Sequence, residues 1–209
     1  MMKVLLFNGS PHKEGATYTA LMEISKELCA AGIETETIQI GSVPFTGCRA
    51  CRGCKGKGAC VFGDDGLNAI IEKCREADGF VFGTPVYYAS PNGTLLSFMD
   101  RLFYAGSAAL TRKPAAAIAC ARRGGTTASV DVLNKYFTIN QMPVVSSTYW
   151  NIIHSNGGAE EAVQDLEGLQ TMRNIGKNMA WLLGCTDAGK KAGIEVPTAD
   201  SGNITNFIR

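Results

Sequence analysis

Short apolar runs alternate with longer amphipathic segments along most of this chain. Five runs rich in Val, Ile, Leu, Phe or Ala predict strands at residues 1–8, 34–40, 79–83, 115–120 and 142–146. Apolar side chains at helical spacing follow each run. Helices are therefore expected from about Thr17, after a cap at Asp64-Asp65, from Ser90-Pro91, around residues 130–137, and over about 159–183. Residues 84–89 are expected to form a loop before the third helix.

Five alternations of strand and helix predict an α/β fold in which helices cover both faces of a parallel sheet. We expect three α/β/α layers and a five-stranded, flavodoxin-like sheet of order 2-1-3-4-5. One such domain would span residues 1–184 and include a cysteine-rich loop at 41–63, with a C-terminal tail at 185–209. In this order the loops after the first, third and fourth strands meet where the strand order reverses, which is where such folds bind FMN.

Composition narrows the functional classes. The chain has 209 residues, is 45% hydrophobic and carries a formal net charge of +1, so neither nucleic acid nor an anionic membrane is expected as a partner. No apolar run approaches the roughly 20 residues of a membrane span. We find no signal peptide and expect a cytoplasmic protein, in which eight Cys favour metal or redox chemistry over structural disulfides.

The first loop has the composition of a phosphate cradle. Gly9-Ser10-Pro11 follows a buried strand and leads through His12 to Thr17, where a helix begins. Backbone N–H groups and the positive end of a helix bind phosphate without needing Arg or Lys. The stretch matches neither Gly-x-Gly-x-x-Gly nor the nucleotide-binding P-loop, which argues against a dinucleotide site and against nucleotide hydrolysis.

Two further loops are candidates for contacts to a flat ring. Pro85-Val86-Tyr87-Tyr88 offers backbone amides and aromatic side chains, and Arg122-Arg123-Gly124-Gly125 allows close approach of backbone to a ligand. Each loop alone also fits a plain connection. Together with the first loop they favour one flavin mononucleotide. Asp100-Arg101, near a helix end, is interpreted as an ion pair or an interface contact.

Four cysteines form the most specific constellation, with the pattern Cys-x2-Cys-x2-Cys-x5-Cys. Compact spacing of this kind lets one loop wrap a [4Fe–4S] cluster. A zinc site, a thiol pair for disulfide exchange, and spare thiols are the alternatives. Basic side chains between the cysteines would offset the charge of an anionic cluster, attract the phosphates of a nicotinamide cofactor, or simply be solvated. The four residues are Cys48, Cys51, Cys54 and Cys60.

These motifs, with the segment from Ser90-Pro91-Asn92-Gly93 to Asp100-Arg101, resemble the NAD(P)H-dependent FMN reductase family, including its iron–sulfur flavoprotein branch. The resemblance covers residues 1 to about 150. It implies bound FMN, NADH or NADPH as electron donor, and a homodimer or homotetramer. By position, the phosphate would meet Ser10, His12 and Thr17, and the ring would meet Pro85, Val86, Tyr87 and Tyr88, with Arg122 and Gly124 near it. Members of the family often have Arg where this chain has His12, and Asn where it has Ala16.

The sequence therefore predicts an FMN-dependent oxidoreductase that passes electrons from NAD(P)H through bound FMN to a quinone, a free flavin or another small acceptor. The chemistry lies on the flavin, so no catalytic side chain is expected. The alternative is an iron–sulfur flavoprotein electron carrier, with a [4Fe–4S] cluster at Cys48–Cys60 and a ferredoxin-like partner. A third hypothesis is a binding domain of the same fold without flavin.

Overall fold

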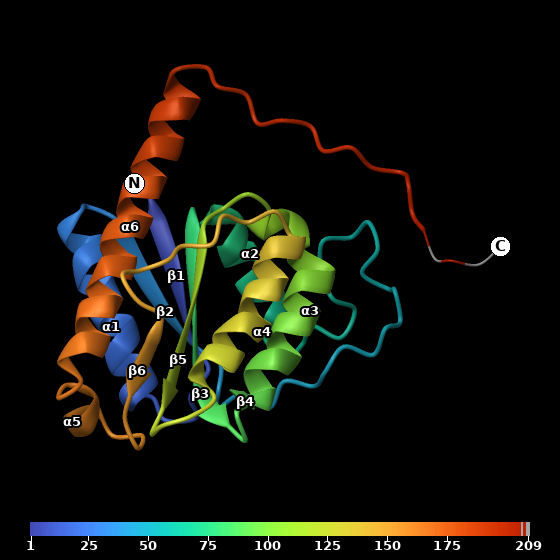
Figure 1. Cartoon of the computed structure of the whole chain (residues 1–209). Helices are drawn as coiled ribbons and strands as arrows, with labels where there is room; N and C mark the ends of the chain where they lie inside the picture. Colours follow the sequence, from blue (N-terminus) through green and yellow to red (C-terminus); the bar gives the residue numbers. More distant parts are fainter. Residues whose placement is uncertain (206, 208–209) are drawn as a thin grey trace.

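The sheet of the computed structural model, which describes residues 1–205 and 207, has the predicted parallel order (Figure 1). Its order is β2-β1-β3-β5-β6, and the short β4 pairs antiparallel with β3 alone. With β4 set aside, this is the order 2-1-3-4-5, so the flavodoxin-like fold is confirmed. The strands are β1 (Lys3–Asn8), β2 (Glu34–Gln39), β3 (Gly79–Tyr87), β4 (Ser90–Pro91), β5 (Ala115–Ala121) and β6 (Ile152–His154).

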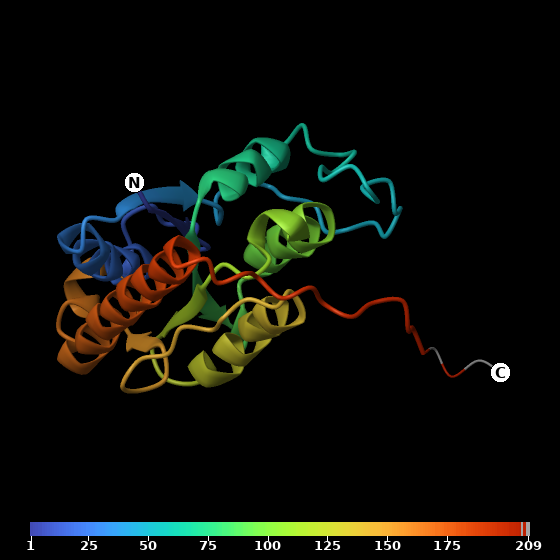
Figure 2. The same ribbon diagram turned by 90° about the horizontal axis from the view of Figure 1, so that it is seen from above.

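Helices cover both faces of the sheet, as Figure 2 shows from above. One face packs against α1 (Ala16–Ala30), α5 (Ala159–Ala162) and α6 (Leu166–Lys191), and the other against α2 (Leu67–Glu76), α3 (Gly93–Leu110) and α4 (Thr126–Ile139). Side chains alternate between these two cores along each central strand: Leu5 and Phe7 enter one, Val4 and Leu6 the other. Within the described residues, no helix combines the length and apolarity needed to cross a bilayer.

A β-hairpin occupies the region where the sequence predicted a loop and the start of a helix. Strand β3 continues to Tyr87 and pairs with Ser90 in β4. The two turn residues, Tyr88 and Ala89, have φ values of 50° and 60°, the left-handed conformation of the turns that best suit two-residue hairpins. The predicted helix start at Ser90-Pro91 was therefore wrong. The N-cap is Asn92, whose side chain accepts hydrogen bonds from the backbone N–H groups of Thr94 and Leu95.

The fifth strand position is filled in two pieces. The predicted strand at residues 142–146 contributes only an isolated bridge between Val144 and Ala115, and the regular strand is β6, paired with β5 from Ala119. Buried Asn151 joins the two pieces: its side-chain amide donates to the carbonyl of Val145 at 3.1 Å, and its own carbonyl accepts from Ala119 N–H. Residues 146–151 therefore leave the sheet edge, and the two pieces on either side of them both pair with β5.

The helix expected over 159–183 is also interrupted, and it ends later than predicted. Asp165 separates α5 from α6 and caps α6 by accepting from Gly168 N–H at 2.9 Å. Helix α6 then continues through Cys185 to Lys191, so the expected start of the tail at residue 185 lies inside a helix. Of the predicted tail, residues 206, 208 and 209 lie outside the described part of the chain.

The cap at Asn92 provides a test of the hairpin-to-helix junction. We expect Asn92→Ala to lower the free energy of unfolding by about 1 kcal/mol, because two N–H groups in the first turn of α3 lose their acceptor. Urea unfolding followed by circular dichroism measures this change. Asn92→Ser, which keeps a capping oxygen, is expected to retain most of the stability; equal losses in both variants would contradict the capping role.

Candidate functional site

A buried asparagine at the end of β1 organises the first loop. The Asn8 side chain accepts from Ser10 N–H at 3.1 Å and donates to the carbonyl of His12 at 3.3 Å and to Gln39 Oε1 at 2.8 Å. Gln39 in turn donates to the carbonyl of Ser10 at 2.6 Å. The end of β2 thereby braces the turn after β1. Sequence reasoning missed Asn8 and Gln39, although an Asn closing an otherwise apolar strand was a visible signal.

The helix that follows the first loop has no side-chain cap. Helix α1 follows Gly15, which offers no side-chain cap, and Ala16 N–H is bonded to the carbonyl of Gly157 in the loop after β6. Ser10 and Thr17 are buried, whereas His12 is exposed. Hydroxyl groups beside an uncapped helix N-terminus match the chemistry of a phosphate ligand.

The β3–β4 hairpin and the loop after β5 lie against each other. Gly125 has a φ of 89°, and a Cβ placed on it would lie 2.5 Å from Ala89 Cα and 2.9 Å from a methyl of Val86. Only glycine permits both this backbone conformation and this approach. The first loop joins the same edge, because Gly9 N–H donates to the carbonyl of Gly83 in β3 at 2.8 Å.

Most of the predicted flavin-contact residues thus lie at the carboxyl ends of the central strands, either in the end of β3 or in the loops that follow the strands. Pro85 and Val86 are half-buried, whereas the predicted ring-contact residues Tyr87, Tyr88, Arg122 and Gly124 are exposed. His154, at the end of β6, has its backbone N–H bonded to the Asp165 carboxylate and its ring 3.5 Å from the same oxygen. These loops form the lower edge of the sheet in Figure 1, at the hairpin.

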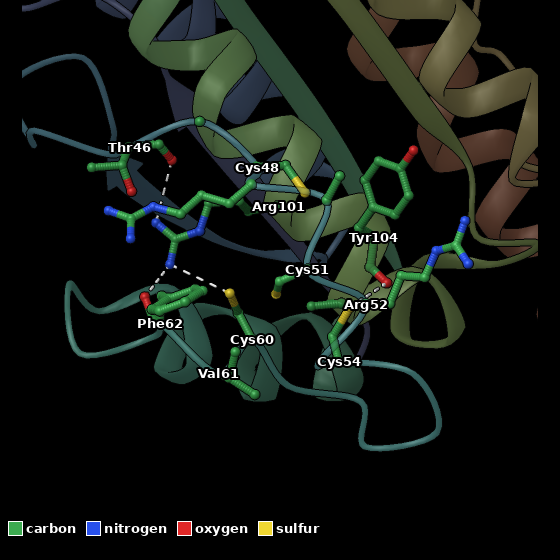
Figure 3. A pocket seen from close by; sticks show the side chains of 14 residues that line it. Thr46, Cys48, Cys51, Arg52, Cys54, Cys60, Val61, Phe62, Arg101 and Tyr104 are labelled. Carbon is green, nitrogen blue, oxygen red and sulfur yellow. Dashed lines mark hydrogen bonds between the residues drawn. The ribbon is translucent and has the colours of Figure 1, made fainter.

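The cysteine loop lies outside α3 and surrounds a separate cavity of about 260 Å³ (Figures 1 and 3). Cys48 and Cys51 are exposed, and Cys54 and Cys60 are half-buried; all four line the cavity. In residues 1–205 and 207, no three Cys, His, Asp or Glu side chains converge closely enough to hold a metal ion. The structure thus brings the four thiols to one cavity. Their donor chemistry fits a metal group held by four thiolates, but the thiols are not arranged as a closed coordination shell.

Arg101 of α3 anchors both ends of the cysteine loop. Its side chain is only 3% exposed and donates to the carbonyls of Thr46, before the first cysteine, and Phe62, after the last. It also donates to the Asp65 carboxylate and lies 3.6 Å from the sulfur of Cys60 (Figure 3). Burial alone would lower the pKa of Arg101, but the hydrogen bonds that it donates to Asp65 and Cys60 raise that pKa.

These contacts correct two expectations. Arg101 pairs with Asp65 and not with its neighbour Asp100, which instead accepts a hydrogen bond from the Tyr136 hydroxyl at 2.5 Å. The N-cap residue of α2 is Gly66, at a φ of 93°, and not Asp65. The Asp65 carboxylate nevertheless accepts from Leu67 N–H, in the first turn of α2, at 3.4 Å, so the expected capping by Asp64-Asp65 is confirmed in part.

Asn68 on α2 holds the last cysteine through the backbone. Its amide oxygen accepts from Cys60 N–H at 2.8 Å, and its amide nitrogen donates to the Cys60 carbonyl at 2.9 Å. Cys54 Sγ lies 3.6 Å from the carbonyl of Tyr104 on α3. The second half of the loop is therefore fixed to two helices, while Cys48 and Cys51 in the first half remain exposed.

The other four cysteines do not share this environment. Cys74 and Cys120 are buried, and burial raises the pKa of each thiol to about 12, which disfavours the reactive thiolate. Cys29 and Cys185 are exposed on α1 and α6. Only the cysteines of the 41–63 loop gather at one cavity.

Comparisons with known proteins find relatives over most of the chain. A model of the NADPH-dependent FMN reductase family matches residues 2–157. An iron–sulfur flavoprotein of Methanocaldococcus jannaschii is 32% identical over 186 residues, covering 86% of this chain and 96% of the relative. An iron–sulfur flavoprotein of Methanosarcina thermophila is 30% identical over 190 residues, covering 87% and 95%.

A solved structure supports the fold alone. The crystal structure of RosB with a bound riboflavin phosphate derivative superposes with a TM-score of 0.69 at 15% identity, covering 100% of this chain and 94% of that one.

The Asn68 clamp is directly testable without any cofactor. We expect Asn68→Ala to increase amide hydrogen exchange at residues 58–63 and to lower the free energy of unfolding by about 1 kcal/mol for each lost hydrogen bond. Asn68→Asp keeps an acceptor for Cys60 N–H and is expected to be intermediate. Unchanged exchange in the alanine variant would show that the loop is ordered by other contacts.

Proposed function

This chain belongs to the NADPH-dependent FMN reductase family, and from that premise we propose that it is an iron–sulfur flavoprotein electron carrier. It would hold FMN at the carboxyl end of the sheet and a [4Fe–4S] cluster in the cysteine loop. A ferredoxin-like protein would be its redox partner. The observation that carries this proposal is the single cavity lined by Cys48, Cys51, Cys54 and Cys60.

Different loop residues would hold the FMN and the cluster. When bound, the cluster supplies one-electron transfer and FMN can take up or release two electrons. Ser10 and Thr17, with the α1 N-terminus, would bind the flavin phosphate; His12 would be a peripheral contact because its side chain is exposed. Pro85, Val86, Tyr87 and Tyr88 would support the ring, with Arg122 and Gly124 beside it.

Holding a cluster would draw the cysteine loop closed. Cys60 and Cys54 would provide the fixed side of the ligand set, because Asn68, Arg101 and α3 hold this half of the loop. Cys48 and Cys51 would move inward from their exposed positions. Zinc or disulfide chemistry would use the same thiols, so iron and sulfide analysis decides between these possibilities.

A second candidate function is NAD(P)H-dependent flavin reduction with a quinone, free flavin or other small acceptor. The feature that favours it is the exposed pair Arg122 and Arg123 beside the hairpin, a suitable partner for the phosphates of a nicotinamide cofactor. Rapid bleaching of the flavin absorbance by NADH or NADPH under anaerobic conditions would support this function. Slow bleaching by both, with fast reduction by reduced ferredoxin, would favour the carrier.

We also propose that the protein works as a homodimer or homotetramer, in which one copy covers the open flavin site of another. A groove of about 360 Å³ lies between α3 and α4, lined by Phe103, Tyr104, Tyr136 and Ile139. Tyr104 is 70% and Ile139 is 84% exposed, an unusual exposure for large apolar side chains bordering a groove. The same Tyr104 borders the cysteine cavity, so this face adjoins the redox site.

Cofactor content tests the main proposal. Protein purified anaerobically is expected to contain FMN and about four irons and four sulfides per chain. Cys51→Ser is expected to lose the iron and retain FMN, whereas Cys185→Ser, which alters an exposed cysteine on α6, is expected to keep both. Wild-type protein with FMN but no iron would overturn the carrier and leave the reductase.

Self-association is tested separately by light scattering after size exclusion. We expect a dimer or tetramer, and Ile139→Glu is expected to weaken it because a charge would be buried in the apolar contact. Leu166→Glu, on an exposed position of α6 on the other side of the sheet, is the matched control. A wild-type monomer at all concentrations would contradict the proposal.

A further inference from the structure

We propose that Arg101 raises the reduction potential of the cluster by placing a buried cation against the sulfur of Cys60. This inference rests on the proposed function, because it assumes that the cysteine loop holds iron and sulfide. It assigns to Arg101 a positioning and tuning role that goes beyond binding the cofactor.

The position of Arg101 differs from that of every basic residue in the cysteine loop itself. Arg49, Arg52, Lys55 and Lys57 are exposed, whereas the Arg101 side chain is 3% exposed and extends from α3 into the cavity (Figure 3). Its Nη2 lies 3.6 Å from Cys60 Sγ. Water and salt screen the exposed charges strongly and the buried one weakly, so Arg101 acts on the cavity with the greatest strength.

The physical effect follows from the charge that reduction adds. Accepting one electron makes a thiolate-bound cluster more negative by one unit, and a nearby fixed cation stabilises that charge. Hydrogen bonds to the ligand sulfurs act in the same direction. Arg101 provides both contributions through one guanidinium group, and it stays protonated throughout because the guanidinium group is not deprotonated in proteins.

Asp65 limits the effect. Its carboxylate accepts from both terminal nitrogens of Arg101, so part of the cation is already neutralised. The Cys60 sulfur therefore faces a cation whose own partner is an anion of opposite effect. Removing the cation should lower the potential, and removing the anion should raise it.

Opposite shifts separate tuning from mere anchoring. Arg101 also donates to the carbonyls of Thr46 and Phe62, so its loss could loosen the loop. Loosening would admit water in either variant and would move the potential in one common direction. Only an electrostatic role predicts that substitutions at Arg101 and at Asp65 move it in opposite directions.

The experiment is an anaerobic redox titration of the intact protein, followed by electron paramagnetic resonance of the reduced cluster. Arg101→Gln is expected to shift the midpoint potential to lower values, and Asp65→Asn to higher values. Arg101→Lys, which keeps a cation, is expected to shift it less than Arg101→Gln. Lys57→Gln removes an equal charge from an exposed position of the same loop and is expected to cause the smallest shift.

Iron and sulfide are assayed in every sample before titration. If Arg101→Gln loses its iron, Arg101→Lys and Asp65→Asn carry the test, and a common direction of shift in these two, or no shift in either, overturns the inference. With iron retained, an unchanged or higher potential in Arg101→Gln also overturns it. A wild-type protein without iron overturns the proposed function and this inference together, whereas full iron with unaltered potentials overturns the inference alone.

Discussion

Burial of the central strands on both faces is the constraint on which the rest of the structure depends. Strands β1, β3 and β5 contribute apolar side chains alternately to two cores, and the buried polar side chains of these strands, Asn8 and Thr84, lie toward their carboxyl ends. Ligand-binding groups are thereby confined to the strand ends and to the connections that leave the sheet. Asn8 is an example: it is the last residue of β1, and its buried side-chain amide makes hydrogen bonds that hold the first loop in place.

Helix α3 connects the two candidate redox sites. Its N-terminus is capped by Asn92 directly after the β3–β4 hairpin, and two to three turns later Arg101 and Tyr104 reach the cysteine cavity. The same helix packs its apolar face into the core. One rigid helix thus borders the β3–β4 hairpin, the cysteine cavity and the groove between α3 and α4. Core packing of α3 therefore fixes the relative placement of these three features.

Positive-φ backbone occurs where the β3–β4 hairpin meets the loop after β5. Tyr88 and Ala89 adopt positive φ at the tip of the hairpin, and Gly125 fits against Ala89 where any side chain would collide. Non-glycine residues hold such conformations only when the surroundings impose them. Here the antiparallel pairing of Tyr87 with Ser90 imposes the turn, which gives the hairpin a defined shape beside the first loop.

The sequence by itself determined the alternation of elements and the four-cysteine loop, because periodicity and residue spacing are local properties that survive into the fold. The sheet order was predicted from the usual topology of flavodoxin-like folds and not from a local pattern. It misplaced the start of α3 and the fifth strand, since pairing of Ser90 with Tyr87 and the bridging by Asn151 are contacts that no local pattern encodes. Only the tertiary structure decided that Arg101 pairs with Asp65, and that the Arg101 guanidinium lies against Cys60. A buried charge takes the partner that packing brings within reach, and that partner here is 36 residues away in the chain.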